Sequence, residues 1–177
     1  REFSLDNDTV LRVFADRRKV DLADLWEGSL PQEETQIAID RTYAVNNNLK
    51  PGDTISSGNR TWTIVGLISL PDYSALFRTN NDSMFDAIDF GVAVVNQDEF
   101  DTYDTDTLVY RYSWTYNKNP KNESQENQWA DDLLDVLVEE VDVESFVPQY
   151  TNQAIHFTGD DLGSDRAMML LLLYIVI

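Results

Sequence analysis

The sequence contains no cysteine and only one histidine, His156, among its 177 residues. A chain without thiols cannot form a disulfide, a thiolate nucleophile or a cysteine-based zinc site. One imidazole cannot replace the several histidines of a conventional zinc site, so no metal is predicted. His156 stands in a short apolar stretch, residues 154–158, which predicts a strand, and we interpret it as a structural histidine.

The motifs that bind nucleotides or activate nucleophiles are also missing. The chain has no Gly-x-Gly-x-x-Gly, no P-loop lysine motif, no Gly-x-Ser-x-Gly and no His-Glu-x-x-His. Any ATPase therefore has to be another chain or domain, and the sequence nominates no catalytic, cofactor-binding or metal-binding residue. We expect that this chain is not an enzyme by itself. A hydrolase with paired carboxylates stays open as an alternative, but adjacent acids such as Asp131 and Asp132 point about 100° apart on a helix.

Basic residues are scarce, since 13 Lys and Arg stand against 32 Asp and Glu and give a net charge of -19. An acidic surface repels nucleic-acid phosphates and anionic lipid headgroups, so nucleic acid is excluded as a partner. Residues 96–165 hold 17 of the acids and 3 of the bases. This half would capture a cationic peptide or a partner protein, in binding that weakens with added salt. Its residues 101–106 lack the glycine and closing glutamate of an EF-hand, so we interpret them as a solvated loop.

Only one long apolar run is present, the eleven residues from 167 to 177. A helix that spans a membrane needs about 20 residues. The run has no polar face, so residues 164–177 predict the start of a transmembrane helix. A buried C-terminal helix or strand is the alternative.

Apolar and β-branched stretches predict strands at 10–15, 37–39, 62–68 and 90–95. Two helices are expected, one over 41–47 capped by Asp40 and one over 123–141 capped by Asn122 or Ser124. The order of these elements indicates an α+β fold.

Three further expectations concern aromatic segments. A short helix is predicted from Asp21 to Trp26, ended by Gly28. Residues 108–116 alternate with period two and predict a strand with an aromatic face that packs in the core. Both Trp26 and Trp62 are expected to be buried.

Four segments appear in an ordered series: Ile-Ala-Ile at 37–39, Leu-Lys-Pro-Gly-Asp-Thr-Ile at 49–55, Trp-Thr-Ile-Val-Gly-Leu-Ile at 62–68, and Phe-Gly-Val-Ala-Val-Val at 90–95. The series resembles the MacB-like periplasmic core domain of FtsX-type ABC transporter permeases. Gln36 departs from the family, where glutamate is common. The resemblance covers roughly residues 10–165.

The resemblance implies a domain on the extracytoplasmic side of the cell membrane, between two transmembrane helices. It implies a porter-like βαβ lobe at 1–30 and 76–163, with a small β-rich sabre-like lobe inserted at 31–75. The expected partners are a cytoplasmic ABC ATPase and a second permease chain. The expected cargo is a peptide, lipid, antibiotic or lipoprotein, and the family supplies no catalytic residue or cofactor.

Overall fold

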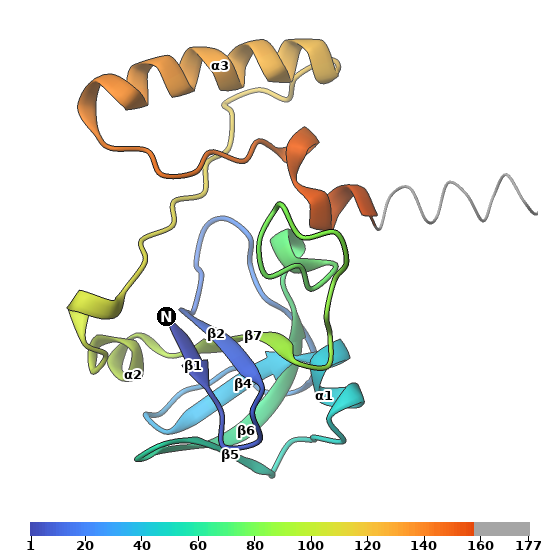
Figure 1. Cartoon of the computed structure of the whole chain (residues 1–177), viewed down its shortest axis with the longest axis vertical. Coiled ribbons are helices and arrows are strands. Elements are labelled where there is room, and N and C mark those ends of the chain that lie inside the picture. Colours follow the sequence, from blue (N-terminus) through green and yellow to red (C-terminus); the bar gives the residue numbers. More distant parts are fainter. Residues whose placement is uncertain (158–177) are drawn as a thin grey trace, which may run out of the picture. The chain divides into compact units, whose positions relative to one another are not determined.

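A computed structural model describes residues 1–157 (Figure 1). The chain separates into two compact units, Arg1–Ser113 and Trp114–Ile177. Within the described residues, every helix is too short or too polar to cross a membrane. The predicted start of a transmembrane helix at 164–177 lies outside the described residues.

The first unit is built on one mixed sheet of seven strands. The strands are β1 (Glu2–Ser4), β2 (Val10–Ala15), β3 (Asp24–Gly28), β4 (Gln36–Asp40), β5 (Thr54–Ser57), β6 (Arg60–Ser69) and β7 (Phe90–Val95). Their order is β1-β2-β7-β4-β6-β3, and β5 pairs with β6. The pairs β2–β7 and β4–β6 are parallel, and the other pairs are antiparallel.

The centre of the sheet consists of the strands that are richest in apolar residues. All six residues of β7 are buried, as expected for a strand that is covered on both faces. β4 pairs with β7, β6 pairs with β4, and both strands carry β-branched residues. The predicted strands at 10–15, 37–39, 62–68 and 90–95 are therefore confirmed.

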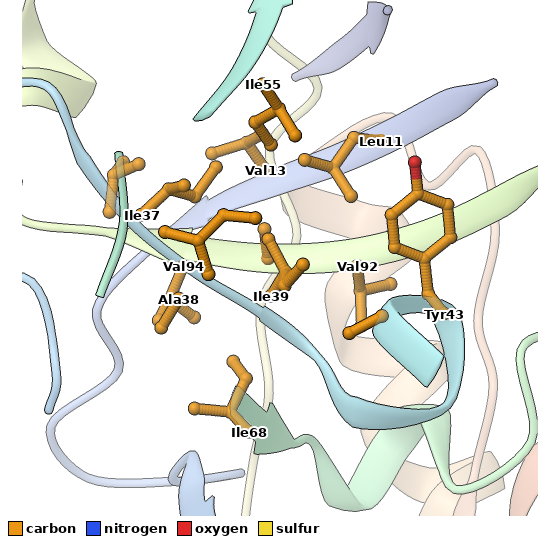
Figure 2. Packing of buried hydrophobic residues seen from close by; sticks show 14 of the residues in the cluster. Leu11, Val13, Ile37, Ala38, Ile39, Tyr43, Ile55, Ile68, Val92 and Val94 are labelled. Atoms are coloured by element: carbon orange, nitrogen blue, oxygen red, sulfur yellow. The ribbon is translucent and has the colours of Figure 1, made fainter. Parts of the chain in front are cut away.

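The core forms where side chains from these strands meet. Figure 2 shows Leu11 and Val13 from β2 in one cluster with residues of β4 and β7, with the ring of Tyr43 at the edge of the cluster. Leu11, Val13 and Tyr43 are fully buried. This interior gives the first unit a closely packed and therefore stiff centre.

The short helix α1 (Arg41–Asn46) follows β4 directly, as predicted. The Asp40 carboxylate accepts hydrogen bonds from the backbone N–H groups of Thr42, at 2.7 Å, and Tyr43, at 3.0 Å. These bonds satisfy two donors that a helix start leaves free. Burial raises the pKa of Asp40 above its ordinary value, although the two backbone donors act against this shift.

The segment that follows β2 corrects one prediction. Residues expected as a helix from Asp21 to Trp26 instead lead into and form β3, the edge strand beside β6. Gly28 lies opposite Gly66, and a Cβ on Gly28 would lie 2.1 Å from the Val65 carbonyl oxygen. This close approach lets β3 pair with β6, and the ladder bonds outweigh the helical tendency of the isolated segment.

The second unit carries the long helix α3 (Glu123–Glu140), and the Asn122 side chain caps it with a 3.0 Å bond from Gln125 N–H. The predicted helix and cap are confirmed. Most of α3 is exposed, and even the apolar residue Val136 is 61% exposed. The predicted strand at 154–158 is wrong where it is described, because residues 153–157 are helical.

Residues 108–113 run as an extended segment that pairs with no strand among the described residues. The predicted strand is therefore wrong, and Tyr112, 85% exposed, lies outside the core. The later aromatics of the same pattern belong to the second unit. There Trp114 stacks on Phe146, with ring centroids 4.8 Å apart. An alternating pattern makes a strand only when a neighbouring strand offers its backbone groups.

The fold class is α+β, as predicted, with a seven-strand mixed sheet and four helices within residues 1–157. Two helices of the first unit, α1 and α2 (Gln97–Asp101), lie next to strands of the sheet. Strands from residues 1–30, 31–75 and 76–163 all belong to this single sheet.

Candidate functional site

The candidate site is a pair of adjoining open hollows in the first unit, which we name the basic concavity. The hollows have volumes of about 290 and 540 Å³. Arg111 lines both of them. The cationic residues that line the basic concavity are Arg1, Arg12, Arg17, Arg18, Lys19 and Arg111. This is an unusual gathering in a chain that has only 13 basic residues.

Arg12 forms the buried floor of the smaller hollow. It projects from β2, and the alternation of the strand directs it away from its core neighbours Leu11 and Val13. Its Nη1 donates to the Tyr73 hydroxyl at 2.7 Å, and its Nε donates to Glu2 at 3.0 Å. A buried arginine requires such partners, since an unpaired charge inside a protein is costly.

Glu2 joins this floor to the loop that precedes β7. Its second carboxylate oxygen accepts a 2.6 Å bond from Arg78. Burial acts against the charged form of Glu2, but the hydrogen bonds from Arg78 and Arg12 outweigh it and lower the pKa of the carboxyl. Burial likewise acts against charged Arg12, and Tyr73 and Glu2 outweigh it and raise the pKa of that group. Both groups are therefore held in their charged forms.

Arg17 anchors the loop that lies between β2 and β3. Its guanidinium donates two bonds to the Asp72 carboxylate, at 2.6 and 3.0 Å. It also lies over the Phe14 ring, 4.5 Å from the centroid. A two-point bond of this kind fixes direction as well as distance, so the start of the loop is held in place.

Four of the cations that line the basic concavity form no ion pair within residues 1–157, namely Arg1, Arg18, Lys19 and Arg111. Arg1 lies over the Phe3 ring, 5.1 Å from its centroid. Arg18 and Lys19 are exposed at the turn after β2, and Arg111 donates to the Tyr73 hydroxyl at 3.4 Å. Arg18, Lys19 and Arg111 are free to attract an anion from solution.

A second charged cluster joins α2 to β6 and is centred on the buried Glu99 of α2. The buried Glu99 accepts a 2.8 Å bond from the Trp62 indole and a 3.0 Å bond from Arg60. Burial, and then the Glu99 carboxylate, raise the pKa of the neighbouring Tyr103 hydroxyl well above its ordinary value. The cluster lines neither hollow, so we assign it to joining α2 to β6.

The residues that the sequence singled out do not come together. His156 is exposed, and its ring contacts the backbone oxygen of Tyr150. Asp104 caps a short 3-10 turn through a 3.1 Å bond from Asp106 N–H. No group of three His, Asp or Glu side chains suited to a metal ion occurs within residues 1–157.

Sequence reasoning missed the basic concavity because its members are distant in the chain. The sequence singles out neither the basic run at 17–19 nor Arg111, which lies in the stretch 108–116 where the predicted strand does not form. The one available signal was three consecutive basic residues in a chain with so few.

Comparisons of this chain with protein-family models, with curated protein sequences and with solved structures found no match.

Proposed function

We propose that the chain is the extracytoplasmic domain of an FtsX-type ABC transporter permease. It would pass motion from a cytoplasmic ATPase to a peptide, lipid, antibiotic or lipoprotein cargo, without catalysing a reaction itself. One observation carries this proposal. Three of the four segments that resemble the family form β4, β6 and β7, which are adjacent strands at the centre of the sheet, and the fourth leads into β5, which pairs with β6. The resemblance therefore follows a contiguous structural unit rather than scattered surface residues.

The packing of the first unit suits the transmission of motion. Close-packed interiors compress little and pass a displacement on as a rigid body. Ile37, Ile39 and Ile64 are fully buried in the sheet centre, and Val92 and Val94 lie beside them. A force applied at one end of such a sheet would move the whole unit.

The family's division into two lobes belongs to the same proposal. Residues 31–75 would form the sabre-like lobe, and residues 1–30 and 76–163 the porter-like lobe. Because β4, β5 and β6 share a sheet with β2 and β7, the two lobes would be parts of one continuous sheet. The partners in the proposal are the cytoplasmic ATPase and a second permease chain.

The proposal predicts the sequence that flanks this chain in its gene. We expect an apolar segment of about 20 residues ahead of Arg1, and about ten further apolar residues after Ile177, because each membrane span needs that length. The coding sequence on both sides is the measurement. A stop codon directly after Ile177, together with no apolar segment ahead of Arg1, would overturn the proposal.

The second candidate function is capture of a cationic peptide or partner protein by the acidic half. In the second unit the exposed face of α3 carries Asp131, Asp132 and Asp135, which supports this candidate. Such binding would fall steeply with salt, since exposed charges are screened over about 8 Å at physiological ionic strength. Binding of a lysine-rich peptide that is equal at low and high salt would exclude it.

A further inference from the structure

The basic concavity has more positive charge than its own carboxylates neutralise. Glu2 pairs with Arg12 and Asp72 pairs with Arg17, so these two arginines are satisfied within the protein. Arg18, Lys19 and Arg111 form no ion pair in the described part of the chain, and the one acid that lines their hollow, Asp16, leaves it with a net positive charge. A chain with an excess of carboxylates has left these three cations, and Arg1 beside them, without an ion pair at one place, which indicates an anionic partner from outside.

The shape of the basic concavity favours a surface over a small enclosed ligand. Both hollows are open, and the larger one lies against the loop that carries Arg18 and Lys19. Arg17 holds the base of this loop against Asp72, so its exposed cations stay at one edge of the unit. Cations that are exposed along an edge can reach several phosphates at once.

The position of this edge in the sheet adds a second argument. β1 and β2 are antiparallel, with Glu2 opposite Arg12, so the start of β1 lies beside the end of β2. Val13 N–H bonds to the Arg1 carbonyl oxygen at 2.8 Å. In the proposed function a membrane span precedes Arg1, and the loop after β2 therefore starts close to the point where the chain leaves the membrane.

We propose that the basic concavity contacts the anionic phospholipid headgroups of the membrane surface and holds the first unit in one orientation above it. The orientation rests on the proposed function, whereas the attraction to headgroups rests on Arg18, Lys19 and Arg111 alone. The phosphate groups accept hydrogen bonds from the two guanidinium groups and attract the lysine ammonium.

The net charge of -19 opposes this contact, and the range of electrostatic forces decides the outcome. At low salt the acidic charge of the whole protein repels the headgroup layer, because electrostatic forces act over a screening length of about 30 Å. At physiological salt the screening length is about 8 Å, so the cations nearest to the membrane determine the interaction. Binding therefore passes through a maximum as salt increases. A simple basic protein shows only a decline.

The test is co-sedimentation of the 177-residue chain with vesicles of phosphatidylglycerol and phosphatidylcholine, and with vesicles of phosphatidylcholine alone. The apolar run at 167–177 is the same in every variant and would bind both vesicle types. The difference in binding between the two vesicle types therefore measures the contribution of the anionic headgroups. Each cation near an anionic surface changes binding about fivefold. The variant R18Q/K19Q is expected to lose roughly 25-fold of the phosphatidylglycerol-dependent binding, and R111Q about fivefold.

The matched control is R41Q/K50Q, which removes the same charge from exposed positions that line neither hollow. Equal loss in R18Q/K19Q and R41Q/K50Q would overturn the inference. Loss of vesicle binding in excess inorganic phosphate, while chloride at equal ionic strength has no effect, would also overturn it in favour of a site for free phosphate. If flanking spans are found but no phosphatidylglycerol dependence, only this inference fails. If the dependence is found without flanking spans, only the proposed function fails.

Discussion

Replacing Trp62 with alanine lowers the free energy of unfolding by about 4 kcal/mol, the range measured when a buried aromatic side chain is removed. Trp62 is 1% exposed, and its indole donates to Glu99 at 2.8 Å and meets the edge of Phe3. The substitution leaves a cavity and removes a donor from a buried carboxylate. Domains are stable by only 5–15 kcal/mol, so this loss is large. Urea denaturation followed by circular dichroism measures it.

Trp26 supplies the matched control for this prediction. It was expected in the core but lies on the edge strand β3 with 58% of its surface exposed, and Arg41 lies over its ring. Trp26→Ala is therefore expected to cost less than about 1 kcal/mol. Equal costs for the two tryptophans would contradict the placement of β6 in the core and of β3 at the edge.

Replacing Gly91 with alanine is expected to cost about 3 kcal/mol, because it overpacks the centre of the sheet. A Cβ at this position of β7 would lie 2.5 Å from Cγ of the Tyr43 ring. The ring cannot move aside easily, since Tyr43 is fully buried and its hydroxyl lies 2.6 Å from that of Thr9. The same denaturation experiment measures the loss.

A double-mutant cycle separates this clash from a general intolerance of β7. Tyr43→Leu alone is expected to cost about 2 kcal/mol, through the lost ring and the lost bond to Thr9. In the combination G91A/Y43L the added methyl group has room. The double variant should therefore lose less stability than the sum of the two single losses, by at least about 1 kcal/mol. Strictly additive losses would show that Gly91 and Tyr43 do not meet.

The central strands could be predicted because their signal is local. The apolar run 90–95 is buried throughout, most residues of the run 62–68 are buried, and Asp40 caps a helix by bonding to the backbone of its sequence neighbours. Burial and capping of this kind need only the residues of the segment itself. The α+β class follows from the order of such segments.

The errors come from segments whose structure depends on a distant partner. Residues 24–28 form a strand because the edge of β6 offers hydrogen bonds and Gly66 allows a close approach. Residues 108–113 have an alternating pattern but pair with no strand in the described region. The residues around each segment do not reveal whether such a partner strand exists.

The basic concavity could not be predicted from the sequence, because it too depends on residues that are distant in the chain. Arg111 reaches it from an extended segment, and Arg18 and Lys19 reach it from the turn after β2. Glu2 pairs with Arg12 and Asp72 pairs with Arg17, and the folding of the sheet brings these partners together. The cations that remain unpaired are therefore known only from the structure. A count of charges along the chain shows only an acidic protein.

Energy transfer in proteoliposomes tests the central claim most directly. The 177 residues contain no cysteine, so a donor dye on Asn59→Cys, in the exposed turn between β5 and β6, labels this domain at one position. Any cysteines in the flanking parts of the proposed permease would be replaced, and the full-length protein would be reconstituted with the proposed ATPase partner and acceptor-labelled lipids. We predict that ATP changes the transfer efficiency, and that substitution of the P-loop lysine of the ATPase abolishes the change. Transfer that is identical with and without ATP, while ATP is hydrolysed, would contradict the proposal that this domain passes on motion.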